Sequence, residues 1–171
     1  MTPLTSLACL PALLHPLRAR APDDADADFL ARLYASTRPD LDSKTADPAF
    51  VASLIGMQQR FQAAGYRNDF PAASHLLLER GGAPCGRIVV DAGAQALRLV
   101  DIALLPEARG QGLGRHVLLA LQACATQLGV PLTLSVHHSN PQARRLYLAL
   151  GFHAHTINAV SEQMVWNNLL P

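Results

Sequence analysis

Three glycines stand at alternate positions between a β-rich segment and a segment with apolar residues at helical spacing. They are Gly110, Gly112 and Gly114. Backbone N–H groups in such a strand-to-helix turn are not shielded by side chains, and they lie at the positive end of a helix dipole. A plain connection is the alternative, but three glycines in five residues exceed what a turn requires. The sequence therefore predicts an anion-binding turn for a phosphate-bearing ligand.

The spacing of these glycines excludes two common nucleotide sites. A dinucleotide-binding turn needs G-x-G-x-x-G near the start of a strand-helix-strand unit, whereas this chain has G-x-G-x-G after a run of strands. A P-loop needs a Gly-Lys-Ser/Thr ending, and no such lysine is present. The ligand is therefore neither a dinucleotide in a Rossmann turn nor a hydrolysed nucleotide.

Periodicity divides the chain into a helical first part and an alternating strand-helix second part. Asp23 and Pro22 introduce a helix that ends before Pro39, and a second helix is expected over 47–64, with Gly65 just beyond its end. The remaining elements are expected as strands at 17–20, 75–79, 85–91, 96–105, 132–136, 152–158 and 162–166, with helices at 112–128 and 141–150. The three strands from 75 to 105 form an antiparallel meander, and the helix after them implies a parallel strand pair.

Composition bounds the class of protein. Of 171 residues, 50% are hydrophobic and 16% are charged, so one folded core is expected. We expect an irregular leader at 1–16, a single domain at 17–167 and a tail at 168–171. A net charge of +1 without a basic run argues against nucleic acid. No apolar run is long enough to cross a membrane, and a cytoplasmic protein is expected.

The number and spacing of the cysteines also favour a cytoplasmic protein. The three cysteines, Cys9, Cys85 and Cys124, form an odd set without a C-x-x-C pair. This pattern favours buried thiols in a reducing compartment over a disulfide framework. Cys124 lies on the apolar stripe of its helix, which indicates core packing rather than a catalytic thiol.

Two motifs in order resemble the GNAT superfamily of acetyl-CoA-dependent N-acetyltransferases. Arg109, Gly112 and Gly114 match R-x-x-G-x-G, and residues 140–152 are similar to the family's N-x-x-A-x-x-L-Y-x-x-x-G-F segment. The resemblance implies an α/β (α+β) fold with a mixed, mainly antiparallel sheet of six to seven strands. That sheet would be splayed between strands 4 and 5 to admit acetyl-CoA, with helices on both faces.

The resemblance also implies roles for individual residues. The glycine turn would bind the CoA pyrophosphate, and strand 4 would hydrogen-bond the pantetheine arm. The residues implied in cofactor binding are Ile102, Ala103, Leu104, Arg109, Gly110, Gln111, Gly112, Leu113, Gly114, Arg115, Asn140 and Tyr147. For Arg115, a solvated charge on the surface is as good an explanation as a phosphate contact.

For two of these residues a purely structural role is an alternative to a role in cofactor binding. Asn140 precedes Pro141 and can simply cap the following helix. Tyr147 lies on the apolar stripe of that helix and can fill the core; the resemblance implies that its hydroxyl protonates the departing CoA sulfur. The general base is not identified by a motif. Asp101 is our candidate, with Glu107 and a water chain as alternatives.

The function that the resemblance implies is transfer of an acetyl group to an amine of a small molecule or peptide, by direct attack in a ternary complex. The predicted partners are acetyl-CoA and an amine acceptor, with a homodimer as an open option. The acceptor is expected between loop 36–45 and turn 158–161. A non-catalytic acyl-CoA-binding domain is the alternative, as is an acyltransferase with another acyl-CoA or an O-acceptor. His137, His138, His153 and His155 lack neighbouring carboxylate or cysteine ligands at metal spacing, so no metal is expected.

Overall fold

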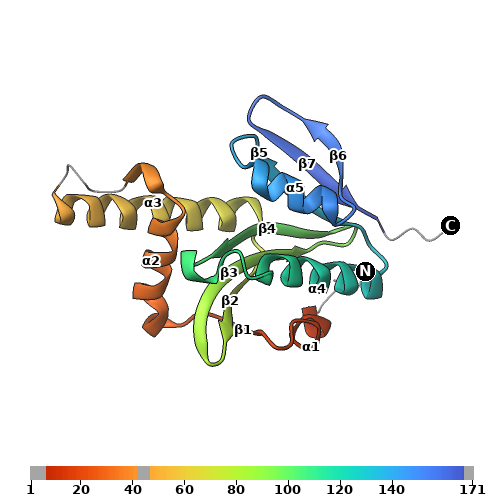
Figure 1. The fold of residues 1–171 in the computed structure, drawn as a ribbon, viewed down its shortest axis with the longest axis horizontal. Coiled ribbons are helices and arrows are strands. Elements are labelled where there is room, and N and C mark those ends of the chain that lie inside the picture. The colour runs from red at the N-terminus through yellow and green to blue at the C-terminus, as the bar shows by residue number, and fades with distance from the viewer. Residues whose placement is uncertain (1–6, 42–46, 168–171) are drawn as a thin grey trace.

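The computed structural model of the 171-residue chain describes residues 7–41 and 47–167 (Figure 1). Its helices are α1 (Leu10–Leu13), α2 (Ala27–Ser36), α3 (Pro48–Asp69), α4 (Leu113–Leu128) and α5 (Pro141–Ala149), with short 3₁₀ turns η1 (Leu7–Cys9), η2 (Asp24–Asp26), η3 (Pro39–Leu41) and η4 (Pro106–Ala108). Its strands are β1 (Arg18–Arg20), β2 (Ser74–Arg80), β3 (Ala83–Ala92), β4 (Leu97–Leu104), β5 (Leu132–His137), β6 (His153–Ile157) and β7 (Ser161–Trp166). None of the helices in this described part is long and apolar enough to span a membrane.

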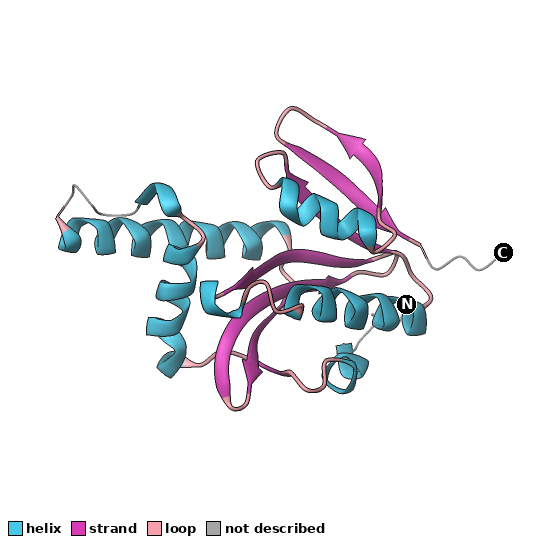
Figure 2. Ribbon diagram, in the orientation of Figure 1, coloured by secondary structure: helices cyan, strands magenta, loops and turns pink. Residues whose placement is uncertain are grey.

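The strands form one seven-stranded sheet in the order β1-β2-β3-β4-β5-β7-β6 (Figure 2). All neighbouring pairs are antiparallel except β4 and β5, which are parallel and are joined through α4. The predicted meander and the final hairpin are both present. The hairpin inserts β7 beside β5, so β6 becomes the edge strand. The predicted mixed, mainly antiparallel sheet is confirmed.

The sheet opens between β4 and β5. The parallel pairing ends at Leu99 and Leu134, although β4 continues to Leu104 and β5 to His137. A register shift in the β3–β4 pairing leaves Val100 unpaired just where the opening begins. An extra residue of this kind bends its strand and increases the local twist, which moves the two strands apart. The predicted splay is therefore confirmed.

Helices cover both faces of the sheet, as predicted. Leu104 packs beneath the first turn of α4, since a Cβ placed on Gly114 would lie 3.9 Å from its side chain. Arg87, which pairs with Ala103 across the β3–β4 ladder, projects from the opposite face and bonds Gln62 of α3. Successive strand residues alternate between faces, so Asp101 lies on the α3 face with Arg87.

Residues 7–16 of the segment expected as an irregular leader contain η1 and α1, so the expectation of irregular structure is wrong for them; residues 1–6 of that segment and the tail expected at 168–171 lie outside the described residues. Leu10, Leu14 and Leu17 are buried in the main core, and α1 packs against α4. The carbonyl of Leu14 also bonds the His116 ring at 2.8 Å. Three prolines suggested a broken segment, but apolar side chains at a spacing of three to four residues can seat a single helical turn.

The second helix is longer than predicted. It begins as expected, with Asp47 accepting the Ala49 N–H at 3.2 Å, but it continues through Gly65 to Asp69. Tyr66 explains the extension, because its ring packs over the sheet near His75 and Arg87. A helical glycine costs about 1 kcal/mol relative to alanine, and tertiary contacts of the next turn outweigh that cost.

The prediction of three thiols is wrong for two of the cysteines. Cys9 and Cys124 form a disulfide that joins the N-terminal segment to α4, across 115 residues of sequence. Cys85 is a buried free thiol, as predicted. Spacing along the sequence could not reveal the pair, because only the packing of α1 on α4 brings the two cysteines together.

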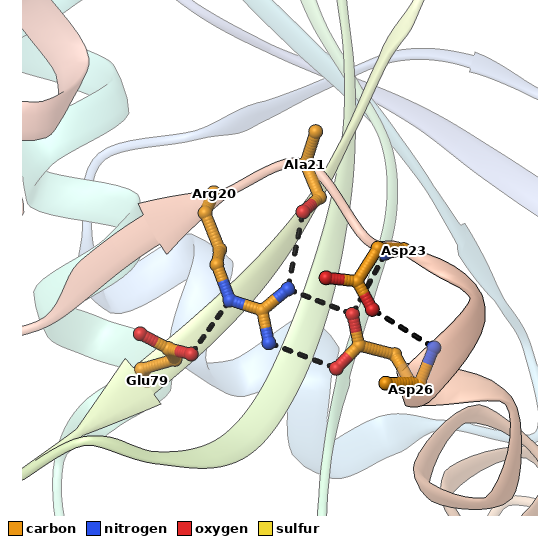
Figure 3. A network of polar contacts seen from close by, with 6 residues as sticks. Arg20, Ala21, Asp23, Asp26 and Glu79 are labelled. Atoms are coloured by element: carbon orange, nitrogen blue, oxygen red, sulfur yellow. Dashed lines mark hydrogen bonds and ion pairs between the residues drawn. The ribbon is translucent and has the colours of Figure 1, made fainter.

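An ion-pair network fastens β1 to the start of α2 (Figure 3). The Arg20 guanidinium donates to both carboxylate oxygens of Asp26, at 2.7 and 2.8 Å, and its Nε donates to Glu79 of β2 at 2.7 Å. Asp26 also accepts the backbone N–H of Asp23 at 2.8 Å. These bonds, the Arg20 pair foremost, lower the pKa of Asp26 from 3.8 to about 2.

We expect Asp26→Asn to destabilise the protein at neutral pH. The native carboxyl has the lower pKa, so its contribution is present above about pH 4 and is lost as the pH falls toward 2. The free-energy difference between the variant and the parent, from urea unfolding at a series of pH values, should therefore shrink across that interval. Asp24→Asn is the matched control, because Asp24 is exposed in the same turn. An equal loss in both variants would contradict the assigned role.

Candidate active site

The glycine turn connects the end of β4 to α4. Gly110 and Gly112 have φ values of +71° and +78°, in the left-handed region, and Gly112 is the N-cap of α4 with no side-chain cap. A Cβ at Gly112 would meet nothing within 4 Å, so backbone conformation rather than space requires glycine there. The first-turn N–H groups of a helix have no intrahelical acceptor. The turn thus offers unshielded donors to an anion, as its sequence indicates.

Two side chains of the turn are engaged by the protein itself. Arg109 donates to the Leu104 carbonyl at 2.9 Å and to Ser36 Oγ at 3.1 Å, which ties the turn to β4 and α2. Gln111 donates to the Glu107 carbonyl and accepts from Arg80, both at 2.6 Å. These contacts hold the turn in shape. Arg115 is exposed on the first turn of α4, while Leu113 and Gly114 are half-buried.

A cavity of about 130 Å³ lies where β4 and β5 separate. It is lined by Leu99, Val100, Asp101, Ile102, Leu134, Ser135, Val136, His137, Asn140 and Tyr147. The predicted site residues Asp101, Ile102, Asn140 and Tyr147 are therefore brought together. Beyond Leu99 the β5-facing edge of β4 has no strand partner, so its backbone groups are available to an extended ligand.

Tyr147 belongs to α5 and lines this cavity. Only 7% of the residue is exposed, and its ring lies 5.8 Å from that of Phe152. Burial raises the pKa of Tyr147, and the negative charge of Asp101 raises it further. The phenol consequently keeps its proton at neutral pH and can serve as a hydrogen-bond donor.

Asn140 is a helix cap in this structure. Its Oδ1 accepts the Ala143 N–H at 3.1 Å, which is the alternative explanation given by the sequence. The residue also lines the cavity at β4 and β5 and a second cavity on the α3 side of β4. The cap bond uses Oδ1, so a contact between the side-chain amide NH₂ and a ligand is compatible with capping.

The second cavity, of about 200 Å³, adds residues that the sequence reasoning missed. It is lined by Leu33, Tyr34, Thr37, Gln62, Arg87, Asp101, Ile102, Ala103 and Asn140. Arg87 forms an ion pair with Asp101 and donates to Gln62 at 3.3 Å. Opposite charges on two strands that are adjacent in sequence, here Arg87 of β3 and Asp101 of β4, are a signal for a cross-strand pair. The sequence alone does not give the strand register, so it did not show that these two residues are neighbours.

Further titratable side chains surround this pair. Burial raises the pKa of Tyr66, with a smaller contribution from Asp101, and the Arg87 guanidinium lies 6.0 Å from the Tyr66 ring centre. Burial, followed by the charge of Arg87, lowers the pKa of His75 below 6.5. Both groups are therefore neutral at pH 7, which leaves Arg87 and Asp101 as the charged side chains that line this cavity.

The expected acceptor entrance is only partly described. Residues 42–45 of the loop 36–45 lie outside the described residues, whereas Thr37 lines the second cavity. At turn 158–161 the Asn158 carbonyl bonds the His138 ring at 2.8 Å, and His137 bonds Ser139 at 2.6 Å. Among the residues that the structure describes, no group of three or more His, Cys, Asp or Glu side chains could hold a metal ion. Absence of a metal from the reaction remains a prediction.

The fold and the site can be compared with known proteins. The model of the acetyltransferase (GNAT) family matches residues 31–152. No protein with a curated description matches the chain.

Solved structures share the fold at low sequence identity. PaiA N-acetyltransferase from Thermoplasma acidophilum, in complex with coenzyme A, has a TM-score of 0.63 and 16% identity, over 87% of this chain and 97% of that one. An acetyltransferase from Thermus thermophilus has a TM-score of 0.61 and 22% identity, over 88% and 96%. The ribosomal-protein-S18-alanine N-acetyltransferase from Escherichia coli has a TM-score of 0.58 and 20% identity, over 91% and 99%.

These likenesses concern the fold, whereas the family match covers most of the chain and includes the glycine turn, Asn140 and Tyr147. Acyl transfer is therefore the class of chemistry to which the site belongs. The chain is a member of the GNAT family of acetyltransferases.

Proposed function

We propose that this protein transfers the acetyl group of acetyl-CoA to an amine by direct attack in a ternary complex. The observation that carries the proposal is that Asp101, Ile102 and Asn140 line both cavities. A thioester in the opening between β4 and β5 and an amine in the second cavity would thus meet at β4. Two of the structurally similar proteins are described as N-acetyltransferases, which favours an amine over an alcohol as acceptor.

The cofactor half of the site fits acetyl-CoA. The N–H groups from Gly110 to Arg115 would bind the pyrophosphate at the start of α4, where a helix N-terminus favours negative charge. The pantetheine arm would lie along the unpaired edge of β4, beside Ile102, Ala103 and Leu104. Acetyl-CoA supplies an activated acyl group, and the protein's part is to hold it, polarise it and assist the departing sulfur.

Tyr147 would donate a hydrogen bond to that sulfur. With ordinary pKa values of about 10 for tyrosine and about 8.5 for a thiol, complete proton transfer is uphill by about 2 kcal/mol. Burial raises the pKa of Tyr147 and increases this cost. The phenol therefore stabilises the developing thiolate by hydrogen bonding, with the proton transferred late.

The acceptor side would use Asp101 and the backbone of β4. Asp101 lines both cavities, so its carboxylate would bind the incoming ammonium and accept its proton directly or through water. A backbone N–H near Leu104 would stabilise the oxyanion, an effect of about 3 kcal/mol for one well-placed donor. Direct attack needs no covalent enzyme intermediate.

An assay with acetyl-CoA and a panel of small amines and short peptides tests the proposal. Release of CoA thiol should depend on the amine, and mass spectrometry should show a product heavier by one acetyl group. Hydrolysis without amine is the background. Acetyl-CoA binding with no turnover of any amine would favour the binding-domain alternative, while faster turnover with longer acyl-CoAs or alcohols would favour the other acyltransferase.

A further inference from the structure

The cavity on the α3 side of β4 carries one positive and one negative side chain. Among the residues that line it, Arg87 and Asp101 are the charged ones, and they bond each other. Only 14% of the Arg87 side chain and 23% of the Asp101 side chain are exposed. The two charges cancel, so the cavity has no net charge, but its positive and negative groups lie side by side. Because both side chains are largely buried, a charged ligand group would interact with them more strongly than in water.

Arg87 has hydrogen-bonding capacity that the protein does not use. Its Nη2 donates to Asp101 and Gln62, whereas its Nη1 has no hydrogen-bond partner among the described residues and, unlike its Nε, is not fully buried. The planar fork of a guanidinium suits a carboxylate. An acceptor molecule that brings a carboxylate would give the Nη1 N–H groups an acceptor.

A simple cationic amine fits this cavity poorly, because Arg87 opposes the attraction of Asp101. A molecule with an ammonium and a carboxylate a few ångströms apart complements both charges. We propose that the acceptor is a free amino acid with an uncharged side chain, whose ammonium binds Asp101 and whose carboxylate binds Arg87. This inference rests on the proposed N-acetyltransferase function and names its substrate class.

The position of the two charges orients such a substrate. Asp101 also lines the opening between β4 and β5, whereas Arg87 faces Gln62 of α3. The amine would consequently point to the thioester and the carboxylate away from it. A cavity of about 200 Å³ is smaller than the sites that enclose drug-sized ligands, and the side chains of Leu33 and Ala103 give it apolar walls. A charged side chain would find no partner among these residues.

The reaction balances with these groups. The ammonium gives one proton to Asp101 or water, the nitrogen lone pair forms the C–N bond, and the C–S bond breaks with its electron pair on sulfur. The second nitrogen proton passes to water as the tetrahedral adduct collapses, while the sulfur takes a proton from Tyr147, whose phenol regains one from water, and leaves as the CoA thiol. The N-acetyl amino acid retains its carboxylate but not its cation, so its attraction to Asp101 is lost and release is favoured.

Matched acceptors test the proposal. Alanine, leucine and phenylalanine are each compared with their amides and with their decarboxylated amines, as kcat/KM from thiol release. We expect each free amino acid to exceed both analogues by about tenfold or more, the range for one charge-assisted carboxylate contact. Equal or faster acetylation of the decarboxylated amines would overturn this inference and leave the proposed function standing. Equal rates for the amides would point instead to a peptide α-amine, and turnover of no amine would end both proposals.

Arg87 variants separate recognition from folding. Arg87→Gln should reduce the preference for leucine over 3-methylbutylamine by about tenfold, whereas Arg87→Lys should retain part of it. Arg60→Gln on the exposed side of α3 removes the same charge elsewhere and should keep the preference. Retained acetyl-CoA affinity shows that the variants are folded.

A measurement on the unaltered protein makes the test independent of those variants. With CoA present, leucine should raise the thermal unfolding midpoint in a concentration-dependent way, and 3-methylbutylamine should not. An equal rise with both compounds, or a preference unchanged in Arg87→Gln, would overturn the assignment of the carboxylate to Arg87.

Discussion

Tyr147→Phe is expected to lower kcat by about 100-fold, at the lower end of the range for loss of a general acid. The substitution removes one hydroxyl and keeps the ring that packs against Phe152. Because the hydroxyl would act on the sulfur as charge develops there, its loss should affect the chemical step and leave ground-state binding nearly unchanged. Steady-state kinetics, with acetyl-CoA affinity measured separately by calorimetry, distinguish these two effects.

The pH dependence gives a second view of the same group. Burial and the charge of Asp101 raise the pKa of Tyr147 above the ordinary tyrosine value of about 10, so the phenol stays protonated to a higher pH than an exposed tyrosine would. The parent enzyme should therefore show no loss of kcat from deprotonation of Tyr147 up to about pH 9, where even an ordinary tyrosine is still mostly protonated. A Tyr147→Phe variant with kcat within about twofold of the parent would remove Tyr147 from the mechanism, because a general acid contributes far more than that.

Gly112→Asp is expected to weaken acetyl-CoA binding by about 100-fold or more. A carboxylate about 5 Å from a phosphate is repelled by about 3 kcal/mol at an effective dielectric constant of about 20. A side chain at this position would meet no protein atom within 4 Å of its Cβ, so the group would project into open space at the start of α4. Calorimetric titration with acetyl-CoA measures the loss.

Gly112→Asn is the matched control for this substitution. It has nearly the same shape and must adopt the same left-handed backbone, with φ near +78°, but it carries no charge. The difference in affinity between the two variants therefore reports electrostatic repulsion alone. It should also diminish as salt is added, because exposed charges are screened. Equal affinities in the Asp and Asn variants would show that no phosphate binds at this turn.

Local signals explain which elements could be predicted. Gly129 and Pro131 closed the helix that became α4, and Asp47 with Pro48 opened α3, because caps and prolines act through neighbouring backbone. The end of α3 was missed because Tyr66 packs against the sheet, a contact that no local signal encodes.

The same division holds for the candidate site. The glycine turn, Asn140 and Tyr147 lie within two short motifs, so their types and spacing alone indicated a phosphate turn and a capped helix with a tyrosine two turns on. Arg87 and Gln62 belong to no motif. They become part of the site only because the β3–β4 register and the length of α3 bring them to Asp101.

By itself the sequence of this protein determined a strand-to-helix anion turn, the order of β1 to β7 and of α2 to α5, and the family that those motifs resemble. The tertiary structure decided which distant residues meet: Arg87 and Asp101 beside the second cavity, and Cys9 and Cys124 in the disulfide. The physical reason is the range of the forces concerned. Backbone conformation and helix capping depend on residues that are close in sequence. Ion pairs and cavities depend on side chains far apart in sequence, which meet only once the register of the sheet is set.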